Sequence, residues 1–144
     1  MKLLSHNGVL TADDSKTNIK LSFDVPDGVK SLRVEYKYNP KFVEDKEKSI
    51  DMLRAACEEC DEKIDDYEQY LPLANLVTLS FDDKNGYRGA CHRHPNEQSI
   101  VISSTGSTLG IINAPVESGE WSVMLNVHFV GSDKVEYSID IEGD

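Results

Sequence analysis

The residues best suited to chemistry lie close together in the stretch DDKNGYRGACHRHPNEQSIVI, residues 82–102. This stretch holds two aspartates, a cysteine, Arg88, and the pair His92 and His94. Histidines separated by one residue point to the same side when they lie on one β-strand, so such a pair can bind a metal ion together. We take Arg88, His92, His94 and a distant histidine, His128, as candidate ligand-binding residues.

The spacing from Gly86 to His92 and His94 matches the opening G-x5-H-x-H of the cupin metal motif. The match ends there, because Glu97 follows after only two further residues and Pro95 interrupts the strand directly behind the pair. The second cupin motif is absent from the sequence. A small cupin-like, metal-dependent enzyme using the two histidines is therefore the alternative hypothesis. We predict no metal site, no cofactor and no catalytic residue.

His128 is predicted on the outward face of its strand, beside Asn126, where it could join His92 only if the two strands lie near each other. A nucleophilic site is not favoured, because Cys91 and His92 are adjacent and neighbouring strand residues face opposite ways. The CEEC segment, residues 57–60, lies among acidic residues that do not stabilise a thiolate. We expect its cysteines to serve as small apolar core residues.

The same stretch has an ordinary structural interpretation. The dipeptide Asn85-Gly86 is a strong signal for a tight β-hairpin turn. Asp82 and Asp83, at the end of the preceding strand, can accept hydrogen bonds from turn amides. A calcium loop would need more oxygen ligands at regular spacing. We therefore expect Arg88 to pair with one of the aspartates and His92 to hydrogen-bond within the sheet.

The elements that must position these residues are predicted to be mainly β-strands. Apolar residues alternate along the runs NIKLSFDVP, SLRVEYKY, NLVTLSF, SIVISS, EWSVMLNVHFV and KVEYSIDI. The pattern predicts a mainly β fold, an antiparallel β-sandwich or jelly roll of about seven or eight strands. We expect a single domain spanning residues 1–144, with Trp121 buried between the sheets.

One long amphipathic helix is predicted as an insertion in this β fold, at about residues 40–71. Asn39 and Pro40 offer capping and first-turn signals, although a later start near Glu44 is an alternative, and Pro72 ends the helix. We expect the helix to lie on the sandwich and to bury both cysteines of the CEEC segment against a sheet. Its apolar stripe comprises Ile50, Leu53, Cys57, Cys60, Ile64, Tyr67 and Leu71.

The charge of the chain limits its partners. The net charge of −11 over 144 residues argues against nucleic acid and anionic membranes. Eleven acidic and four basic residues lie within residues 44–68, a net charge of −7 that we interpret as a solvated surface. No apolar run approaches the roughly 20 residues that cross a bilayer, and the start lacks the apolar segment of a signal peptide. With only three cysteines, we expect a soluble, cytoplasmic protein without a disulfide framework.

Five segments occur in an order that suggests a family, namely FDVPDG, YKYNP, NLVTLSFDDKNGYRGACHR, ISSTGSTLG and SGEWSVMLNV. Together they resemble the β-sandwich domain that precedes the catalytic domain in bacterial metal-dependent phosphoesterases of the PHP (polymerase and histidinol phosphatase) superfamily, including those related to carbamate hydrolases. The resemblance covers residues 21–141, and the YRGACHR block carries most of it.

In that family the catalytic domain opens with a Gly-Asp-Leu-His-x-His type motif that supplies metal ligands, and no such motif occurs in this sequence. The resemblance therefore implies a non-catalytic accessory or binding module. Its expected partners are another protein, a catalytic domain supplied in trans, or a carbohydrate or other small ligand.

Overall fold

The computed structural model describes residues 1–60 and 67–144. The described residues form eight strands, one α-helix and two short 3-10 helices. None of the helices in this part of the chain is long and apolar enough to cross a membrane. The strands are β1 (Lys2–Leu10), β2 (Thr17–Val25), β3 (Ser31–Asn39), β4 (Leu76–Asp83), β5 (Gly86–Cys91), β6 (Glu97–Ser103), β7 (Gly119–Phe129) and β8 (Val135–Gly143). The helices are η1 (Ala12–Asp14), α1 (Lys46–Cys60) and η2 (Tyr67–Tyr70).

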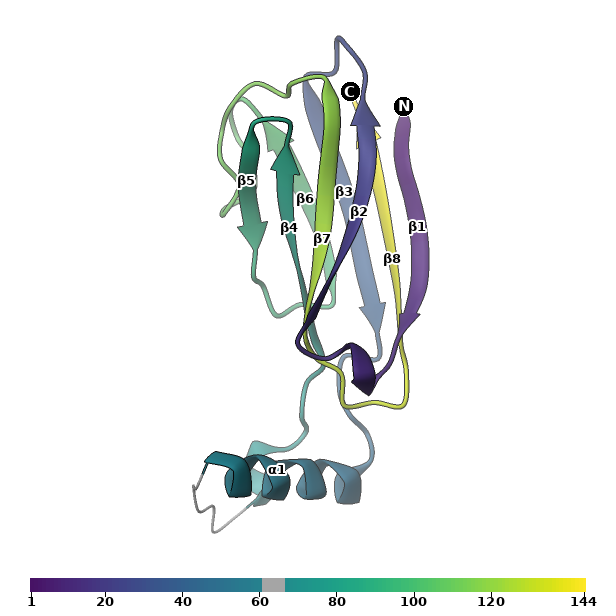
Figure 1. Cartoon of the computed structure of the whole chain (residues 1–144), viewed down its shortest axis with the longest axis vertical. Coiled ribbons are helices and arrows are strands. Elements are labelled where there is room, and N and C mark those ends of the chain that lie inside the picture. The colour runs from purple at the N-terminus through teal and green to yellow at the C-terminus, as the bar shows by residue number, and fades with distance from the viewer. Residues whose placement is uncertain (61–66) are drawn as a thin grey trace.

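The strands form two four-stranded antiparallel sheets with the orders β1-β8-β3-β6 and β2-β7-β4-β5, packed face to face (Figure 1). The first strand pairs with the last, the second with the second last, and so on inward to the β4-β5 hairpin. This pairing is that of a long hairpin wrapped into two sheets, which is the jelly-roll arrangement. The predicted antiparallel β-sandwich is therefore confirmed.

The core lies between the two sheets and contains the alternating apolar residues that the sequence pattern predicted. Trp121 of β7 is only 1% exposed, and its ring lies 6.3 Å from that of Phe23 on the neighbouring β2. The hydroxyl of Tyr36 on β3 donates to the carbonyl of Val77 on β4 at 2.9 Å, which links one sheet to the other. The predicted burial of Trp121 is confirmed.

The predicted hairpin joins β4 to β5. Lys84 and Asn85 form its turn, and Gly86 begins β5 with a φ of +117°, which favours glycine. The carboxylate of Asp83 accepts the N–H of Asn85 at 2.7 Å. The hairpin and the structural role expected of an aspartate are both confirmed, although the turn lies one residue earlier than Asn85-Gly86.

Strand β1 was not among the runs that the sequence pattern identified. The alternation of apolar residues is broken on the less exposed face of β1. At two positions of this face, the strand has His6 and Gly8 and not large apolar residues. A Cβ at Gly8 would come within 2.6 Å of the Tyr137 hydroxyl, so glycine makes room for that ring. The same hydroxyl hydrogen-bonds Nε2 of His6 at 3.1 Å.

The inserted helix begins later than the predicted start at Asn39. Residues 41–43 are extended and hydrogen-bond residues 73–75, with the Val43 N–H donating to the Leu73 carbonyl at 2.8 Å. The carboxylate of Asp45 then caps α1 by accepting the N–H of Lys48 at 3.0 Å. The alternative start near Glu44 was close to the observed one.

Helix α1 lies beyond one end of the sandwich and not on a sheet (Figure 1). The two extended segments that flank it lead the chain away from the strands, which is why the predicted packing is wrong. Cys57 is buried, but it does not belong to the core between the sheets. The side chain of Cys60 and the stripe residue Ile64 lie outside the described residues.

Candidate functional site

Arg88, the first candidate, is a buried residue of β5 with 2% exposure. Its Nη1 lies 3.2 Å from a carboxylate oxygen of Asp83, and the two side chains are only 3% and 9% exposed. Its guanidinium also lies over the ring of Trp121, 5.3 Å from the ring centre. The predicted pairing of Arg88 with an aspartate of the hairpin is confirmed.

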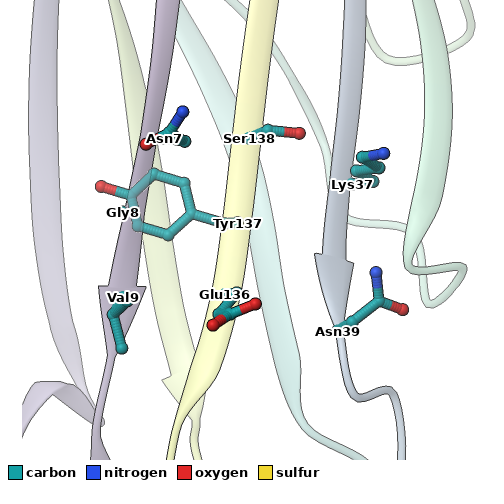
Figure 2. A pocket seen from close by; sticks show the side chains of 8 residues that line it. All are labelled: Asn7, Gly8, Val9, Lys37, Asn39, Glu136, Tyr137 and Ser138. Atoms are coloured by element: carbon teal, nitrogen blue, oxygen red, sulfur yellow. The ribbon is translucent and has the colours of Figure 1, made fainter.

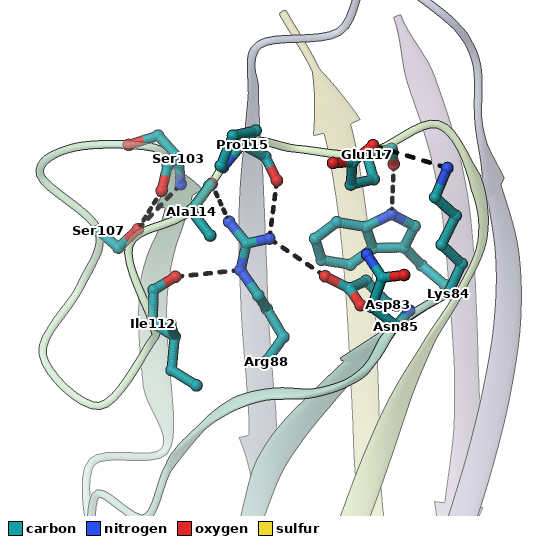
Figure 3. A network of polar contacts seen from close by, with 11 residues as sticks. Asp83, Lys84, Asn85, Arg88, Ser103, Ser107, Ile112, Ala114, Pro115 and Glu117 are labelled. Carbon is teal, nitrogen blue, oxygen red and sulfur yellow. Dashed lines mark hydrogen bonds and ion pairs between the residues drawn. The ribbon is translucent and has the colours of Figure 1, made fainter.

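The other hydrogen bonds of Arg88 hold the long segment between β6 and β7 (Figure 3). Nε donates to the carbonyl of Ile112 at 3.0 Å, Nη1 donates to that of Pro115 at 2.9 Å, and Nη2 donates to that of Ala114. The indole N–H of Trp121 donates to Glu117 of the same segment at 2.8 Å. We define the Arg88 network as Arg88, Asp83, Trp121 and the carbonyls that they bind.

The segment held by this network closes one side of the sandwich. The Ala90 N–H on β5 donates to the Gly110 carbonyl at 3.1 Å, and the Thr108 N–H donates to the Val101 carbonyl on β6 at 2.9 Å. The segment thus hydrogen-bonds the edge strand of each sheet. Because Arg88 is buried and committed to these contacts, we interpret it as a structural residue.

His92 and His128 lie close together on the outer face of sheet β2-β7-β4-β5. In this sheet, β4 lies between β5 and β7. Between them stands Thr78 of β4, whose side chain is on the outer face yet only 1% exposed. Its Oγ1 lies 2.9 Å from Nδ1 of His92 and 2.9 Å from Nε2 of His128. The ring centres of the histidines are 5.9 Å apart. We call these three residues the histidine cluster.

The hydrogen bonds of Thr78 restrict the protonation of both rings. A threonine hydroxyl has one proton to donate and two lone pairs that accept. Among the described residues, the two imidazoles are the only acceptors within reach of that proton, while Nδ2 of Asn126 approaches Oγ1 as a donor at 3.5 Å. One ring therefore accepts the hydroxyl proton, and the other donates an N–H to the hydroxyl oxygen.

Because the rings use different nitrogens, both neutral rings must carry the same tautomer. If His92 accepts at Nδ1, its proton is on Nε2, and His128 must donate from Nε2. If the hydroxyl is reversed, both protons lie on Nδ1. In either case, of the two ring nitrogens that do not contact Thr78, Nε2 of His92 and Nδ1 of His128, one is a donor and the other an acceptor. The structure gives neither of these atoms a partner within the part of the chain that it describes, and both side chains are exposed.

His94 does not share a strand with His92. Strand β5 ends at Cys91, and His94 lies in the following loop, where its carbonyl accepts the ammonium of Lys41. No group of three or more His, Cys, Asp or Glu side chains among the described residues is arranged to hold a metal ion. The structure instead brings His92 and His128 together. From the sequence, we consider His128 only as a third residue beside the pair His92 and His94.

Cys91 points inward, opposite to the exposed His92. It is 2% exposed, and burial raises the pKa of its thiol. A nucleophilic cysteine needs a stabilised thiolate within reach of a substrate. The two adjacent residues therefore do not form a nucleophile and base, as the alternation of the strand predicted.

A shallow hollow of about 410 Å³ lies on the outer face of the other sheet, across β1, β8 and β3 (Figure 2). Lys37, Asn39 and Glu136 line it with exposed side chains. Glu136 makes an exposed ion pair with Lys134, and Asn39 accepts a hydrogen bond from Asn96, so neither is held by a buried group. This hollow therefore lacks the anchored side chains that distinguish the histidine cluster.

Comparison with known proteins does not place the chain in a family. No protein-family model matches the sequence, and no curated protein matches it. A crystal structure of a protein from Sulfurospirillum deleyianum is similar at a TM-score of 0.35 with 10% identity, over 96% of this chain and 98% of that chain. That TM-score is too low to support an argument about fold or function.

Sequence reasoning missed Thr78 and Asn126, the residues that organise the histidine cluster. Thr78 lies between the buried Val77 and Leu79 in the run NLVTLSF, so its outward direction followed from the alternation. What the alternation could not supply was the order of the strands. Only the placement of β4 between β5 and β7 brings Thr78 between the two histidines.

Proposed function

We propose that this chain is a non-catalytic β-sandwich binding module that holds a small polar ligand on the outer face of sheet β2-β7-β4-β5, at the histidine cluster. The observation that carries the proposal is the pair of exposed imidazoles anchored by the buried Thr78 hydroxyl. Each ring is fixed through one nitrogen, and its other nitrogen has no partner among the described residues. Side chains held in this way are pre-organised for binding, because little freedom is lost when a ligand arrives.

The same geometry argues against a catalytic role for the cluster. A threonine nucleophile must be reachable by its substrate, whereas Thr78 is 1% exposed beneath the two rings. Cys91 faces the core. His92 and His94, which the cupin-like alternative needs on one strand, both lie after the end of β5 at Cys91. A binding role needs only the hydrogen-bond donor and the hydrogen-bond acceptor that the second nitrogens of the two rings provide.

We further propose that the module works beside a metal-dependent phosphoesterase domain, in the same chain or in trans. The support for this proposal is the sequence resemblance carried by the YRGACHR block, in which Arg88 and His92 lie. The resemblance leaves a partner protein or a carbohydrate as the other candidate partners. Free thiols at Cys57 and Cys91 suit a reducing compartment, which supports a cytoplasmic location.

The proposal is tested by following the ring signals of the histidines by NMR while a library of small polar compounds is added. We expect a binding compound to shift the signals of both His92 and His128. Binding measured by isothermal titration calorimetry should be lost in the double variant His92→Asn/His128→Asn, whereas His94→Asn, which changes an exposed histidine outside the cluster, should retain it. Compounds that shift only residues of the hollow at Lys37 and Glu136, or a library that shifts neither histidine, would contradict the proposal.

A further inference from the structure

We infer that the ligand of the histidine cluster is a neutral carbohydrate, bound through its hydroxyl groups. This inference rests on the proposed function and adds the chemical class of the ligand. It follows from three observations on the outer face of sheet β2-β7-β4-β5, namely the donor and acceptor pattern of the cluster, the neutral groups beside it and the distribution of charge.

The cluster in its neutral form offers one donor and one acceptor at the same time. A hydroxyl group is both donor and acceptor, so neighbouring hydroxyls of a sugar complement this pair. Reversal of the Thr78 hydroxyl exchanges the donor and the acceptor between His92 and His128. The cluster can therefore match a sugar hydroxyl in either orientation, whereas a fully deprotonated oxyanion, such as a carboxylate or sulfate, only accepts and leaves the acceptor nitrogen without a partner.

Neutral amide and hydroxyl groups surround the cluster. Asn126 of β7 lies opposite Thr78 on one side and opposite Asn18 of β2 on the other. Its Nδ2 also approaches Oγ of Ser80 at 3.4 Å. The amide and hydroxyl groups of this row can donate and accept hydrogen bonds, so they extend the pattern of the cluster across three strands.

Tyr87 supplies an exposed ring at the far end of β5 from the cluster. It is 65% exposed, and its pairing with Asp82 of β4 places it on the same outer face as Thr78 and Ser80. Tyr87 lies five positions before His92, a distance of roughly 15 Å along an extended chain. An aromatic ring offers the C–H face of a sugar an apolar surface, so an oligosaccharide can contact both Tyr87 and the cluster.

The charges on this face do not favour an anion. The charged side chains that share it by register are Lys20, Asp24, Asp82 and Glu120, with a net charge of −2. Lys16 and Arg93 flank the cluster itself, since Lys16 hydrogen-bonds the residue before His128 and Arg93 follows His92, and they bring the sum to zero. The whole chain carries −11. The face as a whole therefore has no excess of positive charge to attract an oxyanion, and the net charge of the chain repels one at long range.

The test compares neutral tetrasaccharides with anions, using the histidine ring signals of the full chain. The sugar probes are tetrasaccharides of β-1,4-linked glucose, α-1,4-linked glucose and β-1,4-linked mannose, and the anion probes are inorganic phosphate and citrate. We expect at least one tetrasaccharide to shift both His92 and His128. Its affinity, measured by isothermal titration calorimetry, should fall at least tenfold in His92→Ala/His128→Ala and should also fall in Tyr87→Ala, which changes an exposed side chain.

The outcomes separate the two proposals. Shifts of both histidines by phosphate or citrate, with no response to any sugar, would overturn the carbohydrate inference and leave the binding module in place. The absence of any shift with all five probes would overturn both. A sugar that binds wild-type protein and both variants equally would show that it uses another surface, which would also overturn the inference.

Discussion

The Arg88 network and the histidine cluster lie on the same sheet, but they differ in what they leave unused. Arg88 makes four hydrogen bonds, one to Asp83 and three to the segment that closes the sandwich, and it is 2% exposed. The histidines use one ring nitrogen each, toward Thr78, and are themselves exposed. The first network is satisfied within the protein, whereas the second is only half satisfied.

This difference shows that residue type does not distinguish a structural network from a binding site. Arg88 and His92 lie four residues apart in the same short block, and either could bind an anionic or polar ligand. Their roles diverge because Arg88 is surrounded by carbonyls that need donors, whereas the second ring nitrogen of each exposed histidine has no partner among the described residues. We therefore expect substitutions in the Arg88 network to change stability and substitutions in the histidine cluster to change binding.

The largest effect is expected for Trp121→Ala, which removes the ring beneath Arg88. Trp121 is 1% exposed, and such large-to-small core substitutions cost about 3 to 5 kcal/mol. The free energy of unfolding, measured with denaturant, checks this expectation. A near-neutral substitution would contradict the assignment of the ring to the core. It would also contradict the structural role of the Arg88 network.

Arg88→Met should cause the second-largest loss of stability, because it leaves the Asp83 carboxylate buried without its partner and three carbonyls without a donor. Breaking a buried ion pair in this way should lower the free energy of unfolding by about 3 kcal/mol. Lys84→Met is the matched control, because its ion pair with Glu117 is exposed. The control should change stability by less than about 0.5 kcal/mol. Equal effects of the two variants would show that the Arg88 network is not structural.

The sandwich was predictable from sequence because alternation of apolar residues is a local signal. Trp121 and the hairpin at Asp83 followed from that signal. The start of α1 did not, because the strong capping residues at Asn39 and Pro40 are overruled by the extended pairing of residues 41–43 with 73–75. The histidine cluster also could not be predicted, since it depends on the order of strands far apart in the chain.

Thr78→Val should have an intermediate effect on stability and a large effect on the tautomers of the two histidine rings. Loss of one hydroxyl that binds two imidazoles should lower the free energy of unfolding by about 1 kcal/mol, since both rings can turn to water. Thr78→Ser retains the hydroxyl and should preserve the linkage between the rings. A loss of several kcal/mol on Thr78→Val, measured by denaturant unfolding, would mean that the cluster serves the fold as the Arg88 network does.

The smallest effect on stability is expected for His92→Asn combined with His128→Asn. Both side chains are exposed, so each change should alter the free energy of unfolding by no more than about 0.5 kcal/mol. Thermal and denaturant unfolding of the double variant check this. Strong destabilisation would erase the contrast between the two networks and favour a structural role for the histidines.

The central claim, that Thr78 links His92 and His128 through one hydroxyl, is tested most directly by the nitrogen chemical shifts of the two rings. Long-range proton–nitrogen NMR spectra, recorded at a pH where both rings are neutral, report which nitrogen carries the proton. The structure predicts the same tautomer, or the same mixture of tautomers, on both rings, and loss of that agreement in Thr78→Val but not in Thr78→Ser. Opposite tautomers on the two rings of the wild-type protein would contradict the account.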